Sequence, residues 1–216
     1  SGAGPITYFN TENFKTKFAC EVKSFDPNNF LDRKEARKLD RFAQYALVVS
    51  EEAIKNSGIN IEEIDHDRAG VIWGSGIGGM NTFFQESVSF GTGNGVPRFN
   101  PFFIPKLISD IPAGHLSIKY KFRGPNFTTV SACASSTNAL IDAYNYIKFN
   151  KADIFIAGGS EACVYEPGIA GFNACHALSK NNDDPKGASR PFDVNRDGFV
   201  LGEGAAILVL ESKESA

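Results

Sequence analysis

The fold of this chain is decided by the stretch Thr128-Thr129-Val130-Ser131-Ala132-Cys133-Ala134-Ser135-Ser136-Thr137-Asn138-Ala139-Leu140. Its first residues are β-branched, which is typical of a buried strand. Residues 139–149 have the apolar periodicity of a helix. We therefore expect Cys133 on a sharp turn between a strand and the first turn of a helix.

A cysteine on such a turn has the surroundings of a nucleophile. Unpaired backbone N–H groups and the positive end of the helix dipole meet there and favour a thiolate. Its neighbours Ala132, Ala134, Ser135 and Ser136 are small, so a substrate can approach the sulfur closely. This is the layout of a nucleophile elbow with sulfur in place of a serine oxygen. The alternative is a buried, inert structural cysteine.

Strands and helices alternate along the rest of the chain, which indicates an α/β fold with a mostly parallel sheet. Gly58 and Pro112 mark a helix stop and a helix kink or restart. A tight glycine loop is expected at 75–79. Helices are expected at 33–56, 82–90 and 101–119, and strands at 68–74, 127–132, 153–157, 198–204 and 205–210.

Composition excludes several classes of protein. The 216 residues are 42% hydrophobic and 22% charged, an ordinary globular composition that is enough to bury a core. The net charge of −3 gives no overall basic surface that would indicate nucleic-acid binding. No apolar run is long enough to span a bilayer, which argues against a membrane protein. The four cysteines are widely spaced without a C-x-x-C pair, so we expect no zinc site or disulfide framework and a cytoplasmic location.

Other candidate motifs are weaker. The run from Gly74 to Gly79 fits neither a dinucleotide fingerprint nor a Walker loop, and is interpreted as a tight turn. The histidines His66, His115 and His176 form no metal pair. Charged residues at 193–203 are interpreted as a buried network that supports glycine bends.

A basic run opens the first predicted helix. On one helix, Lys34, Arg37, Lys38 and Arg41 would share a face. Such a run is usually only a solvated face, and Asp32, Glu35 and Asp40 dilute its charge. Positive charge at a helix N-terminus opposes the dipole, however, and this unfavourable placement is a hint of a docking site for something acidic.

Five motifs in order identify a family: Gly74-Ser75-Gly76-Ile77-Gly78-Gly79, Val130-Ser131-Ala132-Cys133-Ala134-Ser135, Ala157-Gly158-Gly159-Ser160-Glu161, Ser189-Arg190-Pro191-Phe192-Asp193 and Arg196-Asp197-Gly198-Phe199-Val200-Leu201-Gly202-Glu203-Gly204-Ala205. With them the chain resembles the β-ketoacyl-acyl carrier protein synthases of the thiolase superfamily, most of all synthase II. The resemblance implies the N-terminal half of a thiolase-like fold, a parallel-rich mixed sheet with helices on both faces, here without its first strand. On this basis we expect one domain over 1–216, with an irregular lead-in at 1–31 and an α/β core at 32–216.

The resemblance also implies roles for particular residues. Cys133 would take an acyl chain from an acyl carrier protein, and malonyl-carrier protein would then lose carbon dioxide and attack the thioester. Ile77 and Phe172 would line the acyl pocket, and Phe103 and Ile104 would reach the partner's pocket in a homodimer. The carrier protein would dock on Lys34, Arg37 and Lys38, whereas His176 stands where relatives often have an arginine. No cofactor or metal is implied.

The second half of the family pattern, with two catalytic histidines, a lysine and a phenylalanine loop, does not match this chain. We therefore expect incomplete catalysis and an exposed apolar face, with poor solubility or self-association. One alternative is a non-catalytic acyl-binding or assembly half acting with a separate partner chain. Another is a thiolase or a polyketide ketosynthase, which the run from Gly198 to Gly204 and the absence of modular flanks disfavour. A cysteine-free chain-length factor is disfavoured by Cys133.

Overall fold

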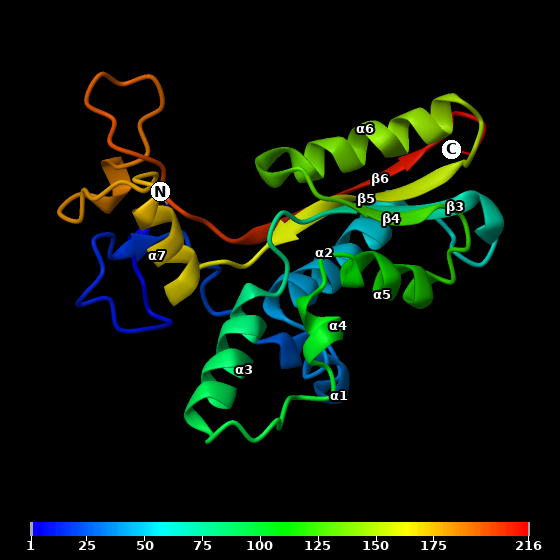
Figure 1. The fold of residues 1–216 in the computed structure, drawn as a ribbon. Helices are drawn as coiled ribbons and strands as arrows, with labels where there is room; N and C mark the ends of the chain where they lie inside the picture. The colour runs from blue at the N-terminus through cyan, green and yellow to red at the C-terminus, as the bar shows by residue number, and fades with distance from the viewer. Residues whose placement is uncertain (1, 216) are drawn as a thin grey trace. The chain divides into compact units, whose positions relative to one another are not determined.

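The computed structural model describes residues 2–215, which form two compact units (Figure 1). The first unit combines the chain up to Phe25 with Met80–Arg98 and Ala162–Gly204. The second combines Asp26–Gly79, Phe99–Glu161 and the chain from Ala205 onward. Each unit has its own buried apolar cluster.

The second unit is built on a sheet with the strand order β4-β3-β5-β6. These strands are β3 (Ala69–Gly74), β4 (Asn126–Thr129), β5 (Ile154–Glu161) and β6 (Gly204–Glu211). β3 runs parallel to both β4 and β5, and Figure 1 shows β6 running opposite to β5. The expected parallel-rich mixed sheet is confirmed.

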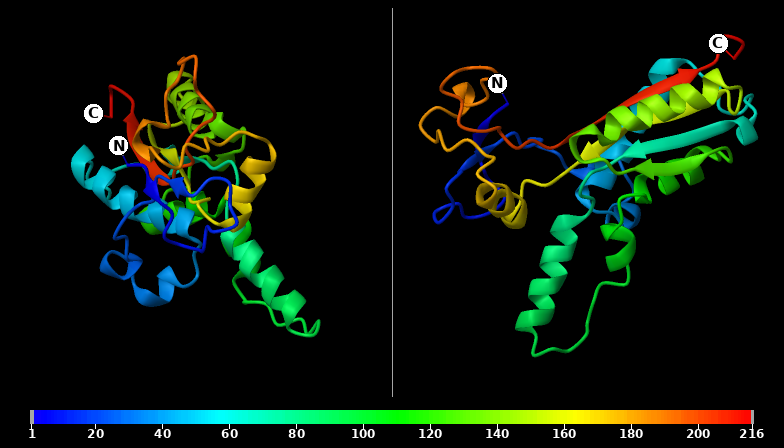
Figure 2. Two further views of the ribbon diagram at one scale, coloured as in Figure 1. Left: turned by 90° about the vertical axis from the view of Figure 1, so that its left-hand side faces the viewer. Right: turned by 45° about the horizontal axis from the view of Figure 1, so that its top comes forward.

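Helices cover both faces of this sheet, as the fold class requires. Helix α6 (Ser135–Lys148) packs on β3 and β5 from one face, while α2 (Arg41–Ser57) packs on β5 and α5 (Ile111–Tyr120) on β3 (Figures 1 and 2). Beneath α6, Ala139 and Ala143 are fully buried against Ile72 and Phe155. The small alanines let the helix lie close to the strands, so its N-terminus is held firmly.

The first unit has little regular structure. A short antiparallel pair joins β1 (Gly4–Pro5) to β2 (Phe18–Ala19), and the helices are α3 (Met80–Thr92) and α7 (Glu166–Ala174). Its core cluster gathers Ile6, Ala19, Val164, Ile169, Leu178 and Leu201.

The first predicted helix is interrupted. Helix α1 covers Arg33–Ala36 only, and α2 begins at Arg41, so the prediction of one helix over 33–56 is wrong at 37–40. Leu39 and Asp40 turn inward and are buried, and Asp40 takes an extended backbone with ψ 163°. The Gln44 amide donates to the carbonyls of Ala36 (2.9 Å) and Leu39 (3.3 Å), which replaces bonds lost at the break. The basic residues at 34–41 therefore do not lie on one helix.

Gly58 and Pro112 end and restart helices as the sequence predicted. Gly58 ends α2 with a left-handed φ of 74°. The segment predicted at 101–119 divides into α4 (Phe103–Leu107) and α5, and Pro112 lies in the first turn of α5, where its missing N–H costs nothing.

The segment before β6 is not a strand. Only isolated bridges at Phe199 and Gly202 occur there, so the prediction of two strands reduces to β6 alone. Gly198 has a φ of 141°, and a Cβ there would overlap the backbone at Leu178. A backbone turned in this way cannot continue a regular ladder.

Three of the four charged residues that were expected to form a buried network in this segment are exposed. Asp193, Arg196 and Asp197 are exposed. Asp197 accepts hydrogen bonds from Ser179 Oγ (2.6 Å) and the Lys180 N–H (2.8 Å), and the Ser179 bond is the main cause that lowers its pKa. The prediction of one buried charge network is therefore wrong for these three residues, although Asp197 does hold a bend of the chain. The fourth, Glu203, is half-buried, and its Oε1 accepts hydrogen bonds from the Tyr8 hydroxyl (2.6 Å) and the Val22 N–H (2.9 Å).

Short 3-10 turns complete the fold. They are Pro27–Asn29, His66–Arg68, Ala132–Ala134 and Pro185–Gly187. Among residues 2–215, no helix is both long and apolar enough to cross a membrane.

Candidate active site

Cys133 lies at the carboxyl end of β4, in the 3-10 turn Ala132–Ala134 that leads directly into α6. The strand-to-helix turn predicted from the sequence is confirmed, and the Cys133 side chain is exposed. Ala132 has a φ of 50°, a left-handed conformation that is uncommon for a residue other than glycine. Such strain persists only where surrounding contacts hold it, and it is common at functional sites.

Side chains on both sides of the turn hold its shape. The Ser131 N–H donates to Ser135 Oγ (2.9 Å), which itself donates to the Ala132 carbonyl (2.7 Å). Thr129 Oγ1 donates to the Ser135 carbonyl (2.7 Å), which ties the end of β4 to the start of α6. The backbone on both sides of Cys133 is thereby fixed.

The strand before Cys133 is less buried than predicted. β4 lies at one edge of the sheet order and its residues are half-buried or exposed, and Val130 is 62% exposed. An edge strand is covered on fewer sides than a central one, which explains the difference.

A pair of glycines allows the N-terminus of α6 to approach the sheet. Gly74 and Gly159 are register partners on β3 and β5. A Cβ on Gly74 would overlap the backbone of Ser136, and one on Gly159 would overlap Ser136 Oγ. The strand expected at 153–157 does not end before Gly158 and Gly159, because β5 continues through both to Glu161. Glycine is required at 159, since α6 leaves no space for a Cβ there.

Glu161 anchors the glycine loop at 75–79. Its Oε1 accepts hydrogen bonds from Ser75 Oγ (2.8 Å), the Gly76 N–H and the Ile77 N–H (3.3 Å). A Cβ on Gly76 would lie 3.3 Å from the Ala132 carbonyl oxygen, so this loop packs against the Cys133 turn. Glu161 therefore holds Ile77 beside the turn that carries the cysteine.

Sequence reasoning did not assign a role to Glu161. The available signal was a carboxylate at the end of a glycine-containing strand, in Ala157-Gly158-Gly159-Ser160-Glu161. What the sequence does not reveal is that the partner loop lies more than eighty residues earlier in the chain.

Phe103 and Ile104 lie in the first turn of α4. Phe103 is half-buried and stacks on Phe99 with ring centroids 5.1 Å apart, whereas Ile104 is exposed. The end of α4 meets the glycine loop, where the Gly79 N–H donates to the Leu107 carbonyl (3.0 Å). The two apolar segments predicted to line acyl pockets are thus joined through α4.

Phe172 belongs to the first unit. It lies on α7, packs against that unit's core cluster and meets Phe199 edge to face with centroids 5.3 Å apart. Its fixed place among apolar side chains is compatible with a pocket-lining role.

The predicted docking residues Lys34, Arg37 and Lys38 are all exposed on and just after α1. Lys38 Nζ lies 5.7 Å from the centre of the Phe102 ring. Arg37 lines a hollow that it shares with Arg33 and Lys106.

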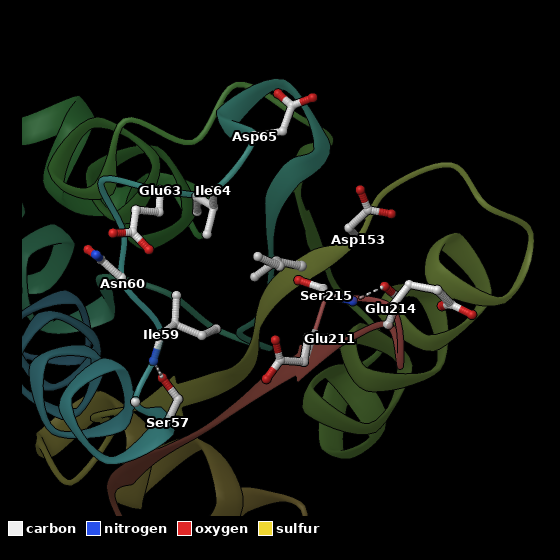
Figure 3. Close-up of a pocket in the computed structure, with 13 residues that line it drawn as sticks. Ser57, Ile59, Asn60, Glu63, Ile64, Asp65, Asp153, Glu211, Glu214 and Ser215 are labelled. Atoms are coloured by element: carbon white, nitrogen blue, oxygen red, sulfur yellow. Dashed lines mark hydrogen bonds between the residues drawn. The ribbon is translucent and has the colours of Figure 1, made fainter.

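A larger cavity of about 600 Å³ lies elsewhere in the second unit (Figure 3). It borders Asp153 and Ile154 at the start of β5, whereas Cys133 follows the carboxyl end of β4. Because β4 and β5 both run parallel to β3, these positions are at opposite ends of the sheet. Five carboxylates line this cavity: Glu63, Asp65, Asp153, Glu211 and Glu214. Of these, Asp153 forms an ion pair with Arg68, with 2.5 Å between Nε and Oδ2. Across residues 2–215, no three His, Cys, Asp or Glu side chains are grouped to hold a metal ion.

Comparison with known proteins identifies the family of the chain. The family model described as "Beta-ketoacyl synthase, N-terminal domain" matches residues 8–216. The chain belongs to the β-ketoacyl synthase family. The resemblance inferred from the five motifs is therefore confirmed.

Curated relatives within this family are named 3-oxoacyl-[acyl-carrier-protein] synthase 2. The protein of Staphylococcus aureus is 47% identical over 216 residues, which is all of this chain and 53% of the relative. The protein of Synechocystis is 44% identical over the same length, covering 52% of the relative. The chain thus spans about half the length of the curated relatives it matches.

Solved ketosynthases have the same fold. A β-ketoacyl synthase from Burkholderia phymatum matches 99% of this chain and 52% of its own, with a TM-score of 0.85 and 31% identity. The ishigamide ketosynthase/chain length factor matches with a TM-score of 0.86 and 29% identity, covering 52% of that chain. The thiolase-like fold class is thereby confirmed.

Proposed function

We propose that this chain is the acyl-accepting part of a condensing enzyme of type II fatty-acid synthesis. The observation that carries the proposal is the exposed Cys133 on a fixed strand-to-helix turn, in a chain of the β-ketoacyl synthase family. Such a turn combines an accessible nucleophile with nearby backbone N–H donors, as acyl transfer requires.

In the first step, the Cys133 thiolate attacks the thioester carbonyl of an acyl-carrier protein. The carbon–sulfur bond to the carrier breaks, the carrier thiolate leaves and takes up a proton, and the acyl group remains on Cys133 Sγ. The backbone N–H of Cys133 donates to the transient oxyanion. Ile77 and Phe172 line the acyl pocket, while Phe103 and Ile104 reach the pocket of a second subunit in a homodimer.

In the second step, malonyl-carrier protein loses carbon dioxide, and the resulting carbanion attacks the Cys133 thioester. The carbon–sulfur bond breaks, the cysteine is released, and a 3-oxoacyl-carrier protein two carbons longer is formed. We assign the promotion of decarboxylation to groups other than this chain's three histidines, because His66, His115 and His176 do not match the family's catalytic histidines. We assign docking of the carrier protein to Lys34, Arg37 and Lys38. We also place the protein in the cytoplasm, a reducing compartment that is compatible with its four free cysteines.

The test is intact-mass measurement after incubation with a long-chain acyl-carrier protein. Wild type should gain the mass of one acyl group, and Cys133→Ala should gain none. Cys175→Ala is the matched control, because Cys175 is also free and exposed. Acylation that persists in Cys133→Ala, or none in a folded wild type, would reject the proposal for this chain.

A further inference from the structure

A hydrogen bond between two side chains spans the Cys133 turn. Asn138, the fourth residue of α6, donates from Nδ2 to Ser131 Oγ at a distance of 2.6 Å. Ser131 is the last residue before the 3-10 turn. Asparagine is a poor helix former because its amide competes with the backbone for hydrogen bonds, so helix propensity does not account for it inside α6. The contact fastens α6 to the residue that enters the turn.

Ala132, which follows Ser131, carries the strain of this turn. Its φ of 50° is left-handed, a region that a residue with a Cβ enters only at an energetic cost. A methyl side chain makes no polar contact that could hold this conformation. The residues on either side must therefore hold it, as strained backbone persists only where its surroundings determine it.

Three hydrogen bonds hold Ser131. Its N–H donates to Ser135 Oγ (2.9 Å), and its carbonyl accepts from the Ala134 N–H (3.1 Å). Both of these bonds stay within residues 131–135. The third bond comes from Asn138, one position before Ala139, which is fully buried between α6 and the sheet. Of the three, the Asn138 bond is therefore the one that ties Ser131 to the packed part of the helix.

The direction of the Cys133 N–H depends on Ala132, because this N–H belongs to the peptide unit that joins the two residues. Among residues 2–215 it makes no hydrogen bond, so it is available to a substrate oxygen. If Ala132 relaxed to an ordinary conformation, its ψ would change and the next peptide unit would rotate. The N–H would then point away from the place where the oxyanion forms.

We propose that Asn138 and Ser131 are positioning residues for acyl transfer, because their side-chain hydrogen bond keeps Ala132 left-handed and thereby directs the Cys133 N–H toward the developing oxyanion. Both residues act through Ala132 rather than on the acyl group. The inference rests on the proposed function and divides the task of the turn in two. Exposure makes the thiol accessible, whereas the directed N–H stabilises the negative oxygen of the intermediate.

The experiment compares two reactions of the same thiol in the whole chain. Acylation by a long-chain acyl-carrier protein passes through an oxyanion. In alkylation by iodoacetamide, the sulfur displaces iodide from carbon and no oxyanion forms. Both rates are followed at Cys133 by peptide mass spectrometry, which separates this residue from the exposed Cys175. A loss of the N–H donor should slow the first reaction and not the second.

Ser131→Ala and Asn138→Ala should each slow acylation of Cys133 by about tenfold at saturating acyl-carrier protein, with alkylation changed by less than about twofold. The double variant should be about as slow as either single variant, because both substitutions remove the same hydrogen bond. Ser131→Thr keeps the hydroxyl and should retain most of the rate. Asn145→Ala is the matched control, since Asn145 is also half-buried on α6, and it should behave as wild type.

Thermal unfolding shows whether each variant is folded, and four results would overturn the inference. Equal slowing of acylation and alkylation would mean that the contact controls only access to the thiol. Additive losses in the double variant would mean that the two residues act separately. Wild-type acylation rates in both single variants would remove the positioning role, and the proposed function would survive. A folded wild type that is alkylated at Cys133 but never acylated would reject the proposed function and the inference together.

Discussion

At the scale of single residues, the position of the glycine loop depends on Glu161. One carboxylate oxygen accepts from Ser75, Gly76 and Ile77, and the loop packs on the backbone beside Cys133. Two backbone N–H groups would lose their protein partner if this carboxylate were removed. Donors that are partly buried and unsatisfied are costly, so the loop would open or rearrange.

Glu161→Ala should therefore release the loop. We expect amide hydrogen exchange at Gly76 and Ile77 to accelerate, and the free energy of unfolding to fall by about 1–3 kcal/mol. The control is Asp153→Asn, next to the opposite end of β5, which weakens the pair with Arg68 without touching the loop. Unchanged exchange at Gly76 and Ile77 in the folded variant would show that Glu161 does not position the loop.

His115 makes the stability of the protein depend on pH. Its ring is half-buried on α5, and among residues 2–215 it has no hydrogen-bond partner. Burial is the main cause that lowers the pKa of His115 below its ordinary 6.5; Glu35 opposes this shift and Lys38 adds to it. The unfolded chain thus binds the proton more tightly than the folded one.

The stability contributed by neutral His115 should be complete above about pH 6.5 and decrease as the pH falls below it. Denaturant unfolding between about pH 5 and 7.5 should show a smaller loss toward low pH in His115→Gln than in wild type. His176→Gln, at an exposed histidine, should behave as wild type. An identical pH dependence in His115→Gln and wild type would assign the effect to other groups.

At the scale of elements, the contact between α6 and the β3–β5 pair decides where Cys133 is presented. The N-terminus of α6 occupies the space above Gly74 and Gly159, which no larger residue leaves open. The helix also buries Ala139 and Ala143 on the strands. Any side chain between helix and sheet must therefore shift the turn before α6.

Gly74→Ala should destabilise the protein by about 1–3 kcal/mol through overpacking and should displace the Cys133 turn. Gly114→Ala is the matched control, because a Cβ there meets nothing within 4 Å and the residue is inside α5. That variant should be neutral or more stable by up to about 1 kcal/mol. Denaturant unfolding of both variants measures the contrast, and equal stability would mean that α6 adapts without cost.

At the scale of the whole chain, apolar side chains are exposed on the α6 side of the sheet in the second unit. Ile141, Tyr144 and Phe149 are exposed on or just after α6, and Phe149 is 65% exposed. Leu208 on β6 is also exposed, and it shares a strand face with Leu210, which packs against the cluster under α6. Contiguous exposed apolar surface favours association.

The isolated chain should therefore self-associate in a concentration-dependent manner, measurable by sedimentation velocity. Replacing Ile141 and Leu208 with Ser should shift the equilibrium toward monomer. Ile118→Ser is the control, because Ile118 is 79% exposed but lies on α5, on the opposite side of the sheet. A monomeric wild type with a cooperative thermal melt would contradict this prediction.

Local features followed from the sequence alone. The turn at Cys133, the end of α2 at Gly58 and the restart of α5 at Pro112 depend on backbone preferences of a few neighbouring residues. The alternation of strands and helices predicted the parallel-rich sheet, and the five motifs predicted the family. These inferences need no knowledge of which distant segments meet.

Other features were decided by tertiary structure, because they depend on packing between segments far apart in the chain. Burial of Leu39 and Asp40 breaks a helix that periodicity alone would continue. The close approach of α6 requires a glycine at Gly159, and β5 continues through it to Glu161. Glu161 meets the loop at Ser75, and Lys106 joins Arg33, only because the folded sheet and helices bring them together. Local backbone preference determined the turn at Cys133. Long-range packing determined the position of the glycine loop at 75–79 and brought Lys106 close to Arg33.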